Sequence, residues 1–351
     1  FYYNIEEPDP DDESVPVLLQ NNSIVTPFEA VTGMYSLPGR HDIDPTAILA
    51  PFYFLFFGLM LSDAAYGLIL TTLCAIILKK YKPEGTTHRM IKMFMFCGLS
   101  TFMWGALFGG WFGNFFTVAA KTFFGKEFVI RPLWFDPLSE PMRLLVVSLI
   151  LGAIHLFVGM GVQAYMDIKD GRPLDALFDI GLWYLLLIGI VLFAFGGKLG
   201  AGAVGIGKIM AIVGAVGILL TGGRKKKGIF GKLTGGLGSL YGITSYLSDV
   251  LSYSRLLALG LATGVVAQVF NTLGSLAGGG IAGSILLIVV FAFGTVFNIA
   301  INALGAFVHS CRLQYVEFFG KFYTGGGRPF APFERKTKYI KILKEGNDNV
   351  K

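Results

Sequence analysis

Two polar stripes that end in arginine are the residues of this sequence best suited to chemistry. The first stripe advances by four, three, four and three residues and consists of Tyr241, Ser245, Ser248, Ser252 and Arg255. The second advances by the same intervals and consists of Asn298, Asn302, Gly305, His309 and Arg312. On an α-helix this spacing places all members of a stripe on one face. We therefore predict two helices whose polar faces each lead to a permanent positive charge.

The two arginines indicate that the stripes have a function, because both arginines lie inside long apolar runs. A charge at membrane depth costs at least ~2.5–3.5 kcal/mol and marks a functional position by default. Serines and asparagines alone would fit equally well as hydrogen-bonding contacts between helices. Arg255 stands in the middle of its run, whereas Arg312 is nearer an end, from which a long side chain reaches the interface more easily.

Three acids near these runs are the other ionisable candidates. Asp63 interrupts an apolar stretch, where a carboxylate at a helix break would meet water. Asp249 is six positions from Arg255 and falls off the stripe, and Glu317 follows Arg312 by five positions. Neither arginine stripe contains an acid. Because a cation relay needs a carboxylate, the sequence predicts that a partner supplies it.

The composition indicates a polytopic membrane protein. Of 351 residues 54% are hydrophobic and only 15% are charged, and the mean hydropathy is +0.63. A soluble domain carries roughly 25% charged residues. The three cysteines (Cys74, Cys97, Cys311) lie in or beside apolar runs without metal-ligand spacing, so we expect no disulfide framework.

The apolar runs predict an all-α fold of about eight transmembrane helices, the last two long and tilted. The first run, about 48–78, is interrupted only by Ser62 and Asp63 and is either one steeply tilted helix or a hairpin that breaks near Leu61–Asp63. The other runs are about 90–119, 141–167, 175–196, 203–221, 238–272 and 281–320. We assign 1–45 to the end of an N-terminal cytoplasmic domain or linker, 46–322 to the transmembrane domain and 323–351 to a cytoplasmic tail.

Loop charge predicts the orientation. The net charge of +6 would suit a nucleic-acid binder, but Lys and Arg concentrate in alternate loops, near 79–92, 169–172 and 222–232, and in the tail after 320. Such segments belong on the cytoplasmic side of a cell membrane. The C-terminus is therefore expected inside, and the side of the N-terminus depends on whether 48–78 crosses once or twice. The acidic start without Met leads us to expect a piece of a longer protein.

Catalytic signatures are missing from the sequence. Gly200–Gly205 (GAGAVG) matches the dinucleotide pattern but lacks the preceding strand and the following acid, so a turn between membrane helices is the better interpretation. No P-loop, His-rich metal cluster or nucleophile elbow is present. We predict neither a catalytic site nor a cofactor in this chain.

Two segments at the arginines resemble a known family. Ser252–Ala262 (SYSRLLALGLA) and His309–Tyr323 (HSCRLQYVEFFGKFY) are similar to the two arginine helices of the V/A-type ATPase stator subunit, called subunit a in eukaryotes and subunit I in prokaryotes. The resemblance covers essentially the whole chain, from the segment at 29–50 to the Gly-rich tail at 325–329, and the prokaryotic branch fits best.

The resemblance implies eight membrane helices, a hairpin at 48–78 and both termini in the cytoplasm. It implies partners as well: a rotor ring of c/K-type subunits with one cation-binding carboxylate each, peripheral-stalk and central-stalk subunits, and lipid. Arg255 and Arg312 match the two arginines of the family. Asp63, Ser248 and His309 match polar positions of its non-cytoplasmic half-channel. The full set that we assign to half-channel lining is Asp63, Ser248, Ser252, His309, Asn302, Asn298, Tyr241 and Glu317.

Some positions depart from the family pattern. Eukaryotic members carry a histidine where this chain has Thr263, and acids near Asn302 and Asn114. An amide holds water or coordinates Na⁺ but cannot relay a proton as a carboxylate does, so the proton relay of those members does not transfer.

The function predicted from the sequence is a rotary-ATPase stator that forms H⁺ or Na⁺ half-channels, with buried arginines that discharge the ring carboxylates. The alternative is a self-contained secondary transporter with an intramembrane Arg substrate site. That alternative predicts inverted repeats and interrupted helices in matching halves, and the sequence contains no convincing repeat.

Overall fold

The computed structural model describes residues 15–39, 42–125, 128–198, 200–224, 229–276 and 280–331. The α-helices in this part of the chain are α1 (Glu29–Tyr35), α2 (Thr46–Leu61), α3 (Ala64–Tyr81), α4 (Gly85–Phe108), α5 (Phe115–Phe124), α6 (Pro141–Lys169), α7 (Pro173–Asp175), α8 (Leu182–Phe195), α9 (Ala201–Thr221), α10 (Ile229–Tyr241), α11 (Ile243–Ser252), α12 (Ser254–Ser275) and α13 (Ile281–Arg312). Short 3-10 turns are η1 (Thr26–Phe28), η3 (Gly196–Lys198) and η5 (Phe319–Lys321), and π-helical segments are η2 (Ala176–Gly181) and η4 (Leu313–Phe318). Two two-residue strands, β1 (Pro16–Val17) and β2 (Arg328–Pro329), pair in parallel.

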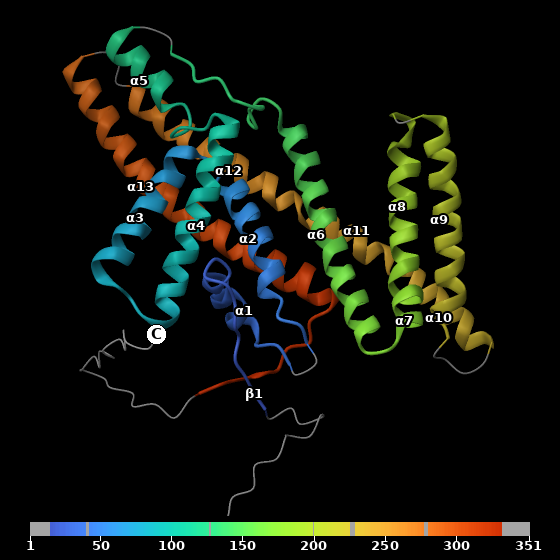
Figure 1. The fold of residues 1–351 in the computed structure, drawn as a ribbon. Coiled ribbons are helices and arrows are strands. Elements are labelled where there is room, and N and C mark those ends of the chain that lie inside the picture. The colour runs from blue at the N-terminus through green and yellow to red at the C-terminus, as the bar shows by residue number, and fades with distance from the viewer. Residues whose placement is uncertain are drawn as a thin grey trace, which may run out of the picture.

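The described helices confirm an all-α polytopic membrane protein. Seven of them are long and apolar enough to cross a membrane, and α2 is a shorter apolar helix beside them. The two longest spans, Thr234–Ser275 and Ile281–Lys321, contain the arginines. In Figure 1 α12 and α13 run obliquely across the bundle, whereas α6, α8 and α9 stand upright. The predicted length and tilt of the last two helices are thus confirmed.

A sharp break at Ser62 and Asp63 makes the first apolar run a hairpin. Ser62 adopts the left-handed region with φ 34°, and its N–H closes α2 on the carbonyl of Gly58. Asp63 then caps the first turn of α3. Because a left-handed residue followed by an N-cap cannot continue a helix, the run divides into two helices, the arrangement that the family resemblance favours.

One predicted span ends earlier than expected. The run at 90–119 is apolar throughout, yet α4 stops at Phe108 because Gly109 terminates it with φ 73°. A loop with two further left-handed residues, Phe112 and Gly113, leads into the short helix α5. Hydropathy alone does not reveal this end, because apolar residues such as Trp111, Phe112 and Phe115 follow it.

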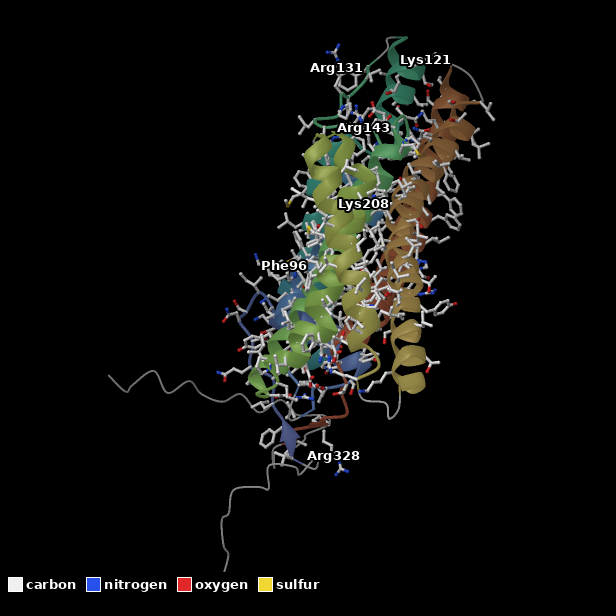
Figure 2. The ribbon with its side chains drawn as sticks, turned by 90° about the vertical axis from the view of Figure 1, so that its right-hand side faces the viewer. Phe96, Lys121, Arg131, Arg143, Lys208 and Arg328 are labelled. Atoms are coloured by element: carbon white, nitrogen blue, oxygen red, sulfur yellow. The ribbon has the colours of Figure 1, made fainter. Side chains whose placement is uncertain are left out.

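The two ends of the bundle carry different elements. The end with α1 and the β1–β2 pair, which we call the terminal end, also holds the turn between α3 and α4, as well as α7 and α10 (Figure 1). The opposite end, which we call the α5 end, holds α5 and the loops around it. Figure 2 shows Arg328 at the terminal end and Lys121, Arg131 and Arg143 at the α5 end.

Helices α3 and α4 approach each other through glycine. A Cβ on Gly105 would overlap the backbone of Asp63 and Ala64, and one on Gly67 would overlap the backbone of Phe102. Small residues let membrane helices pack backbone to backbone. The close packing of α4 against the hairpin break therefore depends on these two glycines.

Helices α8 and α9 form an antiparallel pair beside α6 (Figure 1). Their own buried cluster includes Ile180, Trp183, Leu186 and Ile218 and is separate from the main core. That main core lies between α2, α4, α6, α12 and α13, so the arginine helices pack directly on it.

The segment before α2 is fastened to the chain end that follows α13. The backbone N–H of Gly325 and the hydroxyl of Thr324 both donate to the Asp42 carboxylate, and the Tyr323 hydroxyl donates to the carbonyl of Ser36 at 2.8 Å. Burial raises the pKa of Tyr323, so its hydroxyl remains a donor. We call these contacts, with the β1–β2 pair, the terminal latch.

The three cysteines are free and buried. Cys97 is inaccessible, and Cys311 accepts a weak hydrogen bond from the Tyr53 hydroxyl or donates one to it, at 3.7 Å.

Candidate functional site

The arginines lie where each long helix becomes irregular. Arg255 is the second residue of α12 and directly follows the turn at Tyr253 that separates α11 from α12. Arg312 is the last residue of α13, before the π-helical segment η4. Arg255, Arg312 and His309 are near enough to influence one another electrostatically. The structure thus brings the ends of the two predicted stripes together.

An acid that belongs to neither stripe stands near Arg255. A Glu317 carboxylate oxygen lies 3.8 Å from an Arg255 nitrogen, with the Glu317 side chain only 3% exposed. The physical reason is η4: in a π-helix the hydrogen bonds run from i to i+5, so a residue five positions after Arg312 returns towards the same face. Regular α-helical spacing would turn Glu317 away.

Polar atoms without partners gather in this region. Among the residues that the structure describes, seven buried side-chain N or O atoms have no hydrogen-bond partner. Four of them belong to the arginine region: Arg255 Nη1, His309 Nδ1, Gln314 Nε2 and Glu317 Oε2. Since a buried unpaired polar group costs about 1–3 kcal/mol, such a concentration is typical of a functional site rather than of a helix contact. We call these four residues with Arg312 the arginine site.

A histidine that the sequence patterns did not single out lies beside the arginine site. His155 on α6 is fully buried, with Nδ1 2.8 Å from the Tyr253 hydroxyl and Nε2 3.1 Å from the Gln314 Oε1. Its ring stacks on Phe318 at 4.4 Å. A signal was available, because an ionisable residue in the middle of the 141–167 apolar run is a functional candidate by default.

The first stripe is open on the terminal side of Arg255. Tyr241 is 76% exposed, Ser248 is exposed and Ser252 is half-buried. The interruptions at Gly242 and Tyr253 are single turns, so these residues still lead towards Arg255. Asp249 leaves the stripe, as predicted, and pairs with Lys321, whose ammonium lies over the Tyr246 ring.

Ser248 and Asp63 lie on different sides of Arg255. Ser248 precedes Arg255 on α11, next to the Asp249–Lys321 pair at the terminal end. Asp63 belongs to a cavity at the α5 end, whose walls include Gly260, Gly264 and Gln268 of α12. Arg255 lies between Ser248 on α11 and the part of α12 that lines this cavity.

Asp63 is a buried anchor for a loop. Its Oδ1 accepts from the N–H groups of Ala65, Tyr66 and Phe112, and Oδ2 accepts from Gly113 at 2.9 Å. Four N–H donors hold the negative charge without a cation. The adjacent cavity of about 230 Å³ is open at the α5 end and is also lined by Asn114 and Asp136.

The asparagines of the second stripe are hydrogen-bonded within the bundle. Asn298 donates to the Tyr66 hydroxyl at 3.0 Å and to the carbonyl of Thr263 at 3.1 Å. Asn302 donates to the backbone and side-chain oxygens of Asn298. Nearer the α5 end, Asn271 donates to Asn114 at 3.0 Å. This row of neutral polar groups ties α12 and α13 to the α2–α3 hairpin between the cavity and the arginine site.

No group of three or more His, Cys, Asp or Glu side chains in the described ranges is placed to hold a metal ion. The charged and polar groups of the arginine site offer electrostatic chemistry. Two guanidinium groups, one of them shared with Glu317, and an unpaired imidazole nitrogen can bind and orient a carboxylate.

Comparisons with known proteins agree on one family. Residues 243–335 match the V-type ATPase 116kDa subunit family. The chain is 36% identical over 96% of its length to the A-type ATP synthase subunit I of Methanocaldococcus jannaschii and 37% identical over 97% to that of Thermococcus kodakarensis. It is 24% identical over 95% of its length to the V-type ATP synthase subunit I of Chlamydia trachomatis. The chain spans about half the length of these relatives: 52%, 51% and 58%.

The family match covers both arginines, Glu317 and the irregular turns beside them. The similarity to the relatives extends over almost all the membrane helices. The chain is a multi-pass membrane protein that belongs to the V-type ATPase 116kDa subunit family.

Proposed function

We propose that this chain is the membrane-embedded part of a rotary-ATPase stator and that Arg255 and Arg312 discharge the carboxylates of a rotor ring. The observation that carries the proposal is the set of four unpartnered polar atoms at the arginine site. A carboxylate presented by another subunit would accept hydrogen bonds from Arg255, and the chain's own Glu317 is too far from it for a close pair at 3.8 Å.

The proposed mechanism follows from the cost of charge in lipid. A ring carboxylate crosses lipid only when H⁺ or Na⁺ neutralises it. Arginine stays protonated in proteins. Near Arg255 and Arg312 the ionised carboxylate is favoured, so it releases its cation there. The same fixed charges repel a cation that would pass directly between the two sides.

Polar groups on two sides of the arginine site support this mechanism and define two proposed routes to it. On the α5 side lie the Asp63 cavity and the buried, hydrogen-bonded row of Asn271, Asn298 and Asn302. At the terminal end the exposed face with Ser248 and Ser252 leads towards it from the other side. We assign the first route to the non-cytoplasmic half-channel and the second to the cytoplasmic one.

Loop charge supports the orientation that this assignment needs. The basic residues near 79–92 and the loop at 169–172 lie at the terminal end, with Arg328 (Figures 1 and 2). Lys225–Lys227 and the tail beyond 331 lie outside the described residues. By the positive-inside rule the terminal end is cytoplasmic, so both ends of the described chain face that side. The proposed partners are a c/K-type ring and the stalk subunits.

Arg255→Ala in the reconstituted whole complex tests the proposal. We expect ATP-driven uptake of H⁺ or Na⁺, whichever the wild type transports, to be lost while the complex stays assembled. Arg328→Ala, an exposed arginine at the terminal end, serves as the control and should transport normally. Uptake near the wild-type rate in assembled Arg255→Ala complexes would overturn the role of this arginine.

A further inference from the structure

One face of α6 is shaped to receive both arginine-bearing helices. A Cβ on Gly152 would overlap the Tyr253 ring, so only glycine leaves room for that ring. A Cβ on Gly159 would lie 3.0 Å from the Phe318 ring. Gly152, His155 and Gly159 are spaced by three and four residues, which places them on one helical face. Tyr253 and Phe318 thus fit against α6 on either side of His155.

His155 bonds to both helices at their irregular turns. Its Nδ1 meets the hydroxyl of Tyr253, two residues before Arg255, and its Nε2 meets Gln314, two residues after Arg312. All three side chains are fully buried. The Gln314 Oε1 only accepts, so Nε2 carries the hydrogen, and a neutral imidazole then accepts from Tyr253 through Nδ1. Both ring nitrogens are used.

This connection matters because neither irregular turn fixes its arginine by itself. Tyr253 separates two helices, and η4 replaces regular α-helical bonds directly after Arg312. A small rotation at either turn would move a guanidinium at the end of a long side chain. The aromatic rings of Phe52, Phe56 and Phe318 pack around the imidazole and restrict its orientation.

We propose that His155 is a positioning residue that sets the placement of Arg255 and Arg312 relative to each other, through one hydrogen bond to each arginine-bearing helix. The proposal rests on the proposed function of the arginine site. It assigns His155 no contact with the transported cation or the ring carboxylate. Displaced arginines would discharge the carboxylate less completely and block leakage less well.

The number of cations moved per ATP hydrolysed tests this role. The measurement uses reconstituted whole complexes, with acidification-dependent dye quenching for H⁺ and ²²Na⁺ uptake for Na⁺, and ATP hydrolysis in parallel. For His155→Ala and Tyr253→Phe we expect a fall of roughly two- to tenfold, the factor that corresponds to one buried hydrogen bond. A defect that is only structural would reduce the amount of complex and leave this ratio unchanged.

Conservative and combined variants sharpen the test. His155→Gln retains a donor and an acceptor and should recover part of the ratio. Because His155→Ala and Tyr253→Phe remove the same bond, the double variant should add little to the more severe single one. Ser148→Ala is the matched control, since Ser148 is equally buried on α6 but bonds only to its own helix, at Leu144. Its ratio should equal the wild-type value.

The outcomes separate this inference from the proposed function. Suppose that Arg255→Ala abolishes uptake, but Tyr253→Phe and every His155 variant that assembles move the wild-type number of cations per ATP. This result would overturn the role of His155 alone. If Arg255→Ala itself transports normally, the proposed function fails. If His155→Ala does not assemble, Tyr253→Phe and His155→Gln decide the question, because they remove or change single bonds.

Discussion

Asn302 and His309 stand on one face of α13, two turns apart, yet their polar atoms are in opposite situations. Asn302 is bonded to Asn298, whereas His309 Nδ1 is buried without a partner. Residue spacing makes Asn302 and His309 equal candidates for a functional role, but only His309 has a polar atom free to form a further hydrogen bond. At the scale of residues, the candidates for chemistry are those whose buried donors and acceptors the chain itself leaves unpaired.

In the proposed mechanism Glu317, 3.8 Å from Arg255, competes with the ring carboxylate for that arginine. The Glu317 charge should therefore affect the rate of ATP turnover and leave the number of cations moved per ATP unchanged. In Glu317→Gln the attraction of Arg255 for an incoming carboxylate is no longer shared. We expect ATP turnover to fall roughly threefold to tenfold, equivalent to about 1 kcal/mol, because the carboxylate leaves the arginine more slowly. The cations moved per ATP should stay at the wild-type value. Both quantities are measured in reconstituted complexes.

Asp249→Asn is the matched control for this substitution. Asp249 lies in the same region but pairs with Lys321 instead of an arginine, so its turnover should remain near wild type. A lower coupling ratio in Glu317→Gln, with turnover unchanged, would contradict the competition between the two carboxylates.

The sequence predicted the arginines and their polar stripes, because a local irregularity of the helix changes neither the spacing of polar residues along the chain nor the charge of an arginine. It named Glu317 as a candidate but not its contact with Arg255, and it did not single out His155, for two different reasons. The position of Glu317 depends on the π-helical segment η4, which no residue type in the sequence predicts. The importance of His155 depends on partners about 98 and 159 residues away along the chain, a distance at which spacing arguments carry no information.

At the scale of elements, hydropathy located the helices but not all their ends. The break at Ser62 and Asp63 was accessible because two polar residues interrupt the run. The end of α4 at Gly109 was not accessible, because Trp111, Phe112 and Phe115 extend the apolar run beyond it. There the left-handed backbone conformation, rather than polarity, terminates the helix. The turn at Tyr253 lies in a polar segment that keeps the regular spacing of the first stripe, so the spacing did not mark it.

The contact between α4 and the hairpin break should not tolerate a single added methyl group. In Gly105→Ala the new Cβ meets the backbone of Ala64, which cannot move aside as a side chain would. Overpacking of this kind costs about 1–3 kcal/mol. We expect a lower thermal transition of the detergent-solubilised complex, measured by the amount that still elutes as intact complex in size-exclusion chromatography after heating.

Gly205→Ala provides the comparison for this prediction. Gly205 is also inside a membrane helix, but a Cβ there would meet nothing within 4 Å, and alanine is the better helix former. Its thermal transition should equal or exceed that of the wild type. Equal transitions for Gly105→Ala and Gly205→Ala would disprove the backbone contact at Gly105.

At the scale of the whole molecule, the terminal latch joins the beginning of the described chain to the end of the arginine helix. Tyr315 donates to the carbonyl of Val31 and Tyr323 to that of Ser36, so the segment before α2 follows the last turns after α13. Contacts between residues more than 280 positions apart are invisible to sequence patterns. These hydrogen bonds hold the C-terminal end of α13 against the segment before α2.

Asp42→Ala should open the latch locally. The Asp42 carboxylate accepts from the backbone N–H of Gly325 at 2.8 Å and from Thr324. Without it, hydrogen–deuterium exchange of the peptide at 324–331 should accelerate by roughly tenfold, the factor for one charge-assisted hydrogen bond. Asp136→Ala, at the α5 end, should leave this peptide unchanged. Unchanged exchange in Asp42→Ala would show that other contacts hold the latch.

The burial of all three sulfur atoms makes the chain a ready background for chemical labelling. Cys74, Cys97 and Cys311 are each at most 7% exposed. A single thiol introduced at Tyr241 or Ser248, both on the exposed face that approaches Arg255, would be the accessible thiol of this chain. Its rate of modification by a water-soluble maleimide would report how much of that face is open to water and how much a neighbouring subunit covers. None of the three native cysteines would have to be removed first.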